Sequence, residues 1–169
     1  MAGSELILHE EDFLAISGLA DDLLRRANAR FVAVIDRNGQ PIAWSGVLRN
    51  VDRTALASLA AGNVAATETL AKMIGEPSFS TLYHEGEREH LFLSTMGEIA
   101  IMLIAFDERS SLGLVRLRVR QAEPMFREAL ERVVSRSRAA AAGLKAGGPE
   151  MPEITDEDID NLFGDQFGS

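Results

Sequence analysis

The stretch Ile99-Ala100-Ile101-Met102-Leu103-Ile104-Ala105-Phe106 contains no polar residue. It has the length of a β-strand and falls well short of the roughly 18 apolar residues that mark a membrane-spanning helix. A strand that is apolar on both sides is typical of the middle of a sheet, where both faces are covered. We therefore predict a buried central strand here, and the remaining elements are expected to surround it.

Four further strands are predicted upstream of this one. Two lie directly before it, at 79 to 84 and 90 to 95, and the turn residues Glu85-Gly86 and Met96-Gly97-Glu98 follow them. The other two, Phe31–Ile35 and Pro41–Ser45, flank Asn38-Gly39. This dipeptide favours a type I′ hairpin turn, in which both central residues have a positive φ.

Helical spacing of apolar residues predicts helices at 10 to 28, 52 to 74 and 110 to 138. Pro124 lies inside the last one and should kink or break it. The order α-β-β-α-β-β-β-α predicts an α+β domain at 5–138, in which the helices pack on one five-stranded antiparallel sheet. An Ala/Gly-rich flexible linker is expected at 139–149 and an acidic tail at 150–169.

The net charge of −9 is unevenly distributed. Residues after Pro149 include many acids and no Lys or Arg, whereas the rest of the chain is close to neutral. Nucleic acid and anionic lipid are therefore poor candidate partners. The chain has no cysteine, no run long enough to insert into a membrane and no visible signal peptide, so we expect a cytoplasmic protein.

Residues for catalysis or cofactor binding are not indicated. His9, His84 and His90 do not have the spacing of metal ligands, and the motifs of nucleotide-binding loops and nucleophile elbows are absent. We predict no metal, no cofactor and no active site, which leaves a regulator that dimerises and binds another protein.

The second predicted helix is rich in small residues. At helical spacing, one face carries Ser58, Gly62, Ala65, Thr69 and Lys72. The larger Leu56, Leu59, Leu70 and Ile74 are expected to face the sheet. Two interpretations stay open, because the small residues allow either close packing on the chain's own sheet or close approach by another protein.

The tail contains the pattern of a short helix from Thr155 to Phe163. Thr155 is a good N-cap, Ile154 and Ile159 form a hydrophobic staple, and Gly164 ends the helix. Ile159, Leu162 and Phe163 form one apolar edge, which we expect to fold onto a partner. The alternative is a disordered, solubilising tail.

Several motifs together are similar to the MglB-type bacterial members of the roadblock/dynein light chain family. They lie in the second helix and the turn that ends it, in the turn after the predicted strand at 79 to 84, at the start of the last helix and in the tail: Leu56-Ala57-Ser58-Leu59, Ala61-Gly62-Asn63-Val64-Ala65-Ala66, Leu70–Glu76, His84-Glu85-Gly86, Ser111–Leu117 and Asp156–Phe163.

The resemblance implies a homodimer whose protomers join their sheets, and a GTPase-activating protein for a Ras-like GTPase of the MglA type in cell polarity and motility. It implies one GTPase per dimer, bound across the paired second helices, and concentration at a cell pole. Activation would reposition groups of the GTPase without an arginine finger. The tail would contact a second GTPase surface and aid nucleotide exchange. Ser58, Gly62, Ala65, Thr69 and Lys72 would form the docking face.

Two other functions compete with GTPase activation. A roadblock scaffold would bind a GTPase or a paralogue without accelerating hydrolysis. A small-molecule sensor would need a cavity with convergent polar groups, and the all-apolar strand argues against one.

Overall fold

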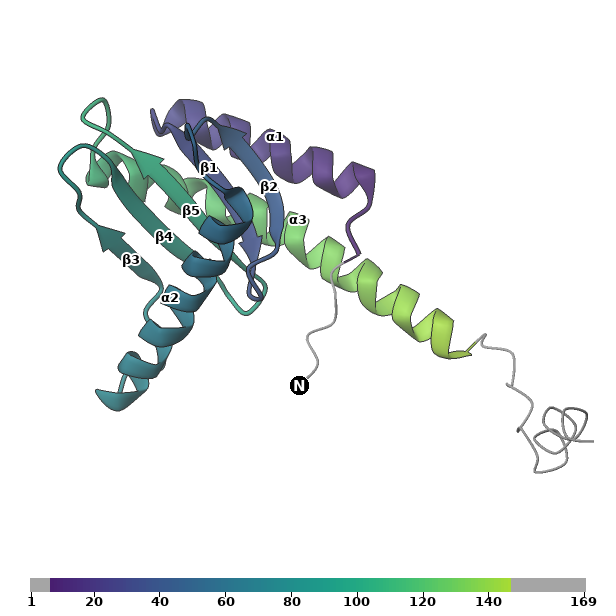
Figure 1. The fold of residues 1–169 in the computed structure, drawn as a ribbon. Coiled ribbons are helices and arrows are strands. Elements are labelled where there is room, and N and C mark those ends of the chain that lie inside the picture. The colour runs from purple at the N-terminus through teal and green to yellow at the C-terminus, as the bar shows by residue number, and fades with distance from the viewer. Residues whose placement is uncertain (1–6, 147–169) are drawn as a thin grey trace, which may run out of the picture. The chain divides into compact units, whose positions relative to one another are not determined.

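The computed structural model describes residues 7–146 (Figure 1). The predicted order of elements is confirmed: α1 (Glu10–Arg26), β1 (Phe31–Asp36), β2 (Pro41–Gly46), α2 (Arg53–Met73), β3 (Thr81–His84), β4 (His90–Met96), β5 (Ala100–Phe106) and α3 (Leu112–Ala146). The strands form one antiparallel sheet in the order β2-β1-β5-β4-β3. β5 is the middle strand, and every one of its residues is buried.

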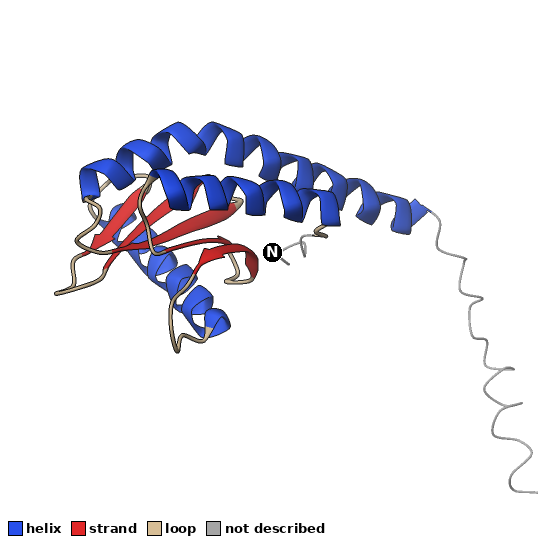
Figure 2. Cartoon of the chain, turned by 90° about the horizontal axis from the view of Figure 1, so that it is seen from above, coloured by secondary structure: helices blue, strands red, loops and turns tan. Residues whose placement is uncertain are grey.

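The helices cover the two faces of the sheet unequally. Figure 2 shows α1 and α3 together on one face and α2 alone on the other. The core beneath α1 and α3 contains large side chains such as Phe92, Phe106 and Phe126. The core beneath α2 pairs large sheet residues with the small helix residues Ala57, Ala60 and Ala61 and with Val64. α2 therefore packs on the sheet mainly through methyl groups.

The hairpin between β1 and β2 is confirmed, but its predicted type I′ turn is wrong. Gly39 has a φ of +84°, whereas Asn38 is not among the residues with positive φ. The turn is instead held by Asp36, whose carboxylate accepts hydrogen bonds from the backbone N–H groups of Asn38 and Gln40, at 2.8 and 2.7 Å. An aspartate side chain that accepts from nearby backbone groups stabilises a longer turn than the two-residue one we expected.

The last helix is longer than predicted. α3 continues to Ala146, so residues 139 to 146 are helical where a flexible linker was expected. The run Ala139-Ala140-Ala141-Ala142 explains this difference, because alanine is the residue that most favours a helix. α3 is also continuous across Pro124, so the break that was one of the two expected outcomes is absent, and buried residues follow the proline at Phe126, Ala129 and Leu130.

No helix among residues 7–146 is long and apolar enough to cross a membrane.

Candidate functional site

α2 is fixed on the sheet at its start and along both sides. Asp52 caps the helix by accepting hydrogen bonds from the N–H groups of Thr54 and Ala55, at 2.9 and 3.1 Å. Gly39 of the β1–β2 turn lies so close that a Cβ there would be 2.8 Å from the Cα of Ser58. A side chain at position 39 would therefore push the start of α2 away from the sheet.

Polar contacts hold the middle of α2. Arg37, in the same turn, forms an ion pair with Glu68, and the carboxylate of Glu98 lies 3.9 Å from the same guanidinium. On the other side, the Asn63 amide nitrogen lies 3.0 Å from Nε2 of His84 in β3. The helix is thus tied to one end of the β1–β2 hairpin and to the edge strand β3.

The five predicted docking residues, Ser58, Gly62, Ala65, Thr69 and Lys72, are all exposed on α2. We call them the small-residue stripe. A Cβ added at Gly62 would meet no atom within 4 Å, so nothing in the chain's own packing requires a glycine there. The Thr69 hydroxyl donates a hydrogen bond to the Ala65 carbonyl at 3.2 Å, so it is used within the helix. The stripe is open to another molecule.

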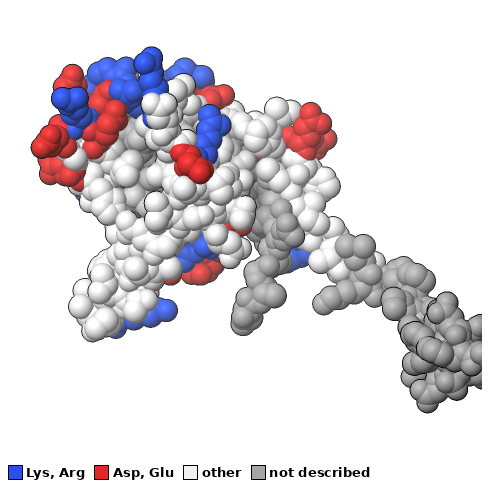
Figure 3. Space-filling view, viewed as in Figure 1, with Lys and Arg blue, Asp and Glu red and all other residues white. Residues whose placement is uncertain are grey.

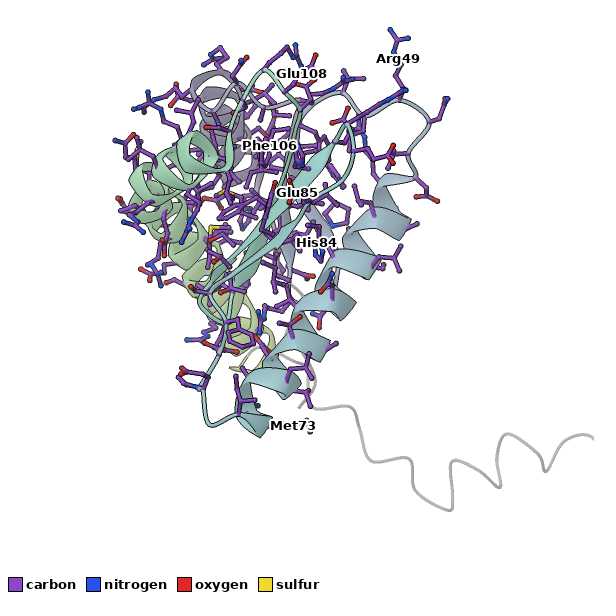
Figure 4. All side chains as sticks on the ribbon, turned by 90° about the vertical axis from the view of Figure 1, so that its left-hand side faces the viewer. Arg49, Met73, His84, Glu85, Phe106 and Glu108 are labelled. Carbon is purple, nitrogen blue, oxygen red and sulfur yellow. The ribbon has the colours of Figure 1, made fainter. Side chains whose placement is uncertain are left out.

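Large apolar residues of α2 also face solvent, which corrects the prediction that they cover the sheet. Leu59 is 73% exposed, Leu70 58% and Ile74 70%. Met73, which is not in the set predicted to face the sheet, is 77% exposed. We call these four residues the apolar ridge; Figure 4 shows Met73 at the free end of α2. Leu56 alone of the predicted set packs partly against the core.

The reason lies in the periodicity of the alanines. The residues of α2 that are buried against the sheet are Ala57, Ala60, Ala61, Val64 and Ala71, which recur at helical spacing. The helical spacing of the alanines in the sequence indicates which face of α2 is buried, and the leucines occupy the other positions. Side-chain size favours the leucines as the buried set and periodicity favours the alanines, and the structure follows the periodicity.

The surface around α2 is poor in charge. The helix has only three charged residues, Arg53, Glu68 and Lys72, and the first two have partners: Arg53 lies over the Trp44 ring at 5.6 Å, and Glu68 pairs with Arg37. In Figure 3 the surface of α2 is largely free of charged side chains, which gather instead around the loops that follow β3 and β5. A protein partner can bind such a surface without desolvating many charges.

β3 is an exposed edge strand next to α2. It pairs only with β4, and all its residues except Leu82 are exposed. His84 points toward α2 (Figure 4). Partial burial, together with the Glu85 carboxylate, raises the pKa of Tyr83 above its ordinary value. The edge therefore offers free backbone groups and little charge to a pairing strand.

The charged loops form a separate cluster. The guanidinium of Arg109 donates hydrogen bonds to Asp107 and lowers the pKa of that carboxyl to about 2. Arg30 lies 3.4 Å from Asp107 and 3.2 Å from Glu89. These contacts tie the start of β1 to the loop before α3.

The three histidines lie in three different environments. His84 contacts Asn63, His90 lies 3.3 Å from the Tyr83 hydroxyl, and His9 precedes α1 without a capping hydrogen bond from its side chain. Among residues 7–146, no group of three or more His, Asp or Glu side chains is arranged to hold a metal ion. Three predicted partner-binding residues, Ile159, Leu162 and Phe163, lie outside the described part of the chain.

Comparison with known proteins places this chain in a family. The family model described as "Roadblock/LC7 domain" matches residues 17–106. The chain is similar to the solved structure of Myxococcus xanthus MglB, with 43% sequence identity and a TM-score of 0.70; the match covers 76% of this chain and 96% of that one. The gliding protein MglB of Thermus thermophilus is 34% identical, with a TM-score of 0.69 and coverage of 76% and 97%.

A further solved structure is described as an MglB with a tetrameric arrangement. It is 32% identical, with a TM-score of 0.72, and the match covers 76% of this chain and 97% of that one. Comparison with curated protein sequences found no match.

Proposed function

Since this chain belongs to the Roadblock/LC7 family, among its MglB-type members, we propose that it is a GTPase-activating protein for a Ras-like GTPase of the MglA type. The observation that carries the proposal is the small-residue stripe of α2. The stripe is exposed, nearly uncharged and not needed for the chain's own packing, since the site of Gly62 is open. A switch region of a GTPase can approach the helix backbone closely there. The protein would act in the cytoplasm and, through the GTPase, in cell polarity and motility.

The working form is a homodimer. The β3 edge has free backbone groups, and the apolar ridge of α2 lies on the same face of the sheet as the His84–Asn63 contact. Pairing of two β3 strands would join the two sheets and bring the two apolar ridges together. The unpaired backbone groups of β3 and the apolar side chains of the ridge would then both be removed from solvent. The tetrameric arrangement named for an MglB relative supports self-association. One GTPase would then bind one dimer.

The mechanism is repositioning of groups that the GTPase already has. The stripe contains no arginine. The four arginines that we consider as a finger, Arg116, Arg118, Arg120 and Arg127, belong to α3, and the arginine at the start of α2, Arg53, lies over the Trp44 ring. α3 packs on the opposite face of the sheet from α2. An arginine finger contributes roughly 10³- to 10⁵-fold to hydrolysis. Each of these arginines replaced by Ala should lower stimulated hydrolysis far less than that.

The test measures GTP hydrolysis by the MglA-type GTPase of the same organism, with and without this protein. The double variant Ala65→Arg/Thr69→Arg should abolish binding and stimulation while the fold stays intact, because two bulky cations prevent close approach and both positions are exposed. Arg132→Ala, an exposed change on α3, is the matched control and should stimulate normally. If the double variant also stimulates normally, the stripe is not the docking site. If the wild-type chain binds without stimulating hydrolysis, it is a scaffold.

The proposed dimer is tested separately, by the mass of the protein in solution. Light scattering at tens of micromolar should give twice the chain mass of 18.4 kDa. Leu70→Asp/Met73→Asp should shift the mass toward the monomer, because a buried carboxylate at the paired ridges would lose its hydration. A wild-type mass of one chain would contradict the dimer.

The tail adds a second contact in this proposal. Deletion of residues 147 to 169 should spare dimerisation and most of the stimulated hydrolysis, and should weaken GTPase association or any acceleration of nucleotide exchange. Loss of stimulation at saturating truncated protein would show instead that the tail belongs to the activating site.

A further inference from the structure

A polar cavity lies on the face of the sheet opposite α2, between α3 and the strands β3 and β4. Its volume is about 160 Å³. The floor is apolar, made of Phe92 and Val119, which are 2% and 4% exposed. The rim consists of hydroxyl, guanidinium and carboxylate groups from Ser80, Thr81, Ser94, Thr95, Arg116, Arg120 and Glu123.

Ser94 is the unexpected residue in the cavity. It lies on β4 between Phe92 and Met96, whose side chains are in the core beneath α3, and it is itself only 5% exposed. A hydroxyl at such a position costs free energy unless a polar group meets it. Thr81 is its Cα partner on β3, so two hydroxyl residues stand side by side across the strand pair.

The charge of the cavity is positive. Arg116 and Arg120 are one helical turn apart on α3, and neither forms an ion pair within residues 7–146. The one acid of the rim, Glu123, is neutralised by Arg127, whose Nη2 lies 2.6 Å from its carboxylate. Two exposed arginines without an ion-pair partner in this part of the chain thus line the same cavity as the hydroxyl residues of β3 and β4.

We propose that this cavity binds a phosphate group, either as inorganic phosphate or as the phosphate of a small phosphomonoester. Guanidinium groups match the oxygens of phosphate in paired, charge-assisted hydrogen bonds, and the hydroxyls of Ser94 and Thr81 donate to the remaining oxygens. Size limits the ligand: a cavity of roughly 150 Å³ takes a molecule about as large as benzene, whereas drug-sized ligands occupy about 300 Å³ or more. The cavity itself therefore holds a phosphate group and little more. The site uses no residue of the small-residue stripe, although Thr81 belongs to β3, the strand that pairs in the proposed dimer.

The first experiment titrates inorganic phosphate into the full-length protein by isothermal titration calorimetry, in chloride buffer of matched ionic strength. We expect saturable binding with a dissociation constant of about 1 mM or tighter. Arg116→Gln/Arg120→Gln should weaken it about a hundredfold, because each of the two lost charge-assisted bonds is worth about a factor of ten. Glutamine keeps the helix, since it is a good helix former. Ser94→Ala keeps both charges and should weaken binding to a smaller extent.

Arg132→Gln is the matched control. Arg132 is an exposed arginine of the same helix, paired with Glu128 and remote from the cavity lining. This variant should bind phosphate like the wild type, and equal weakening by it would overturn the site, because the effect would then be general charge attraction. Absence of saturable binding well above 1 mM would overturn it as well.

Two further probes identify the ligand chemistry. Acetate should bind much more weakly than phosphate if four tetrahedral oxygens are recognised; equal affinity for acetate would contradict the phosphate assignment. O-phosphoserine separates the two sources. Tighter binding than that of phosphate assigns the cavity to a phosphomonoester, and binding of phosphate alone assigns it to the free anion.

Discussion

α2 and α3 cover the two faces of one sheet in different ways. α3 places large residues such as Phe126, Leu130 and Val133 in the core and turns its charged residues outward. α2 places alanines against the sheet and leaves Leu59, Leu70 and Met73 in solvent. Burial of a large apolar side chain contributes about 1.5 to 3 kcal/mol, and that of a methyl group about 0.8. α3 therefore contributes more to the stability of the fold than α2, whose outer face is exposed and forms the docking face in our proposal.

The largest expected effect tests the α3 side. Phe126→Ala should lower the free energy of unfolding by about 3–5 kcal/mol, because Phe126 is fully buried and leaves a cavity. Urea unfolding at one fixed protein concentration measures this. Val64 has the largest side chain that α2 buries, and Val64→Ala should lower the free energy of unfolding clearly less. The comparison of the two helices fails if the two variants lose equal stability.

A smaller effect tests how closely α2 lies to the sheet. Ala57→Leu should destabilise the protein by about 1–3 kcal/mol, because Ala57 is fully buried and a leucine must displace the helix. Ala65→Leu makes the same change on the exposed side of the same helix and should stay within about 0.5 kcal/mol. Urea midpoints of the two variants provide the measurement. Similar costs at both positions would mean that α2 is not close-packed on its alanine face.

A gain in stability is expected at Gly62. Gly62→Ala should raise the free energy of unfolding by about 0.5–1 kcal/mol, since the position is open and glycine is unfavourable inside a helix. Gly113→Ala, in the first turn of α3 and equally open, is the matched control for the glycine effect. A loss of stability in Gly62→Ala would show that the glycine serves the fold itself.

The smallest effect concerns the loop that leads into α3. The pKa of Asp107 is about 2 in the folded chain, below its ordinary value of 3.8, because of the hydrogen bonds from Arg109. The group therefore stabilises the fold above about pH 4, and this contribution is lost as the pH falls through 2. The stability difference between wild type and Asp107→Asn should shrink over that interval. A difference that stays constant down to pH 2 would contradict the lowered pKa.

The arrangement of the sheet follows directly from the sequence, whereas the orientation of α2 does not. The run from Ile99 to Phe106 predicts a central strand because no polar face is left to point at water, and β5 is that strand. The orientation of α2 depends on how closely a helix approaches a sheet, and this distance is set by Gly39 and the alanines acting together. A prediction from residue size alone places Leu59 and Leu70 against the sheet, whereas both are exposed.

Local propensity explains the other differences. The alanines after Arg138 extend α3 because nothing in the chain ends the helix there, although the same composition suggested a linker. The exposure of the small-residue stripe agrees with a docking face, but its use depends on a partner, which no periodicity in the sequence identifies. The tail residues stay predictions for the same reason.

The alanine face of α2 also has a consequence for motion. A helix held by methyl groups, one N-cap and a few polar contacts gives up little when it lifts from the sheet, so local opening of α2 requires less free energy than global unfolding. Its amide hydrogens should exchange with deuterium sooner than those of the buried turns of α3. A second copy of the chain or a GTPase bound to α2 would slow that exchange. The exchange rate of the α2 amides would therefore show whether a partner is bound.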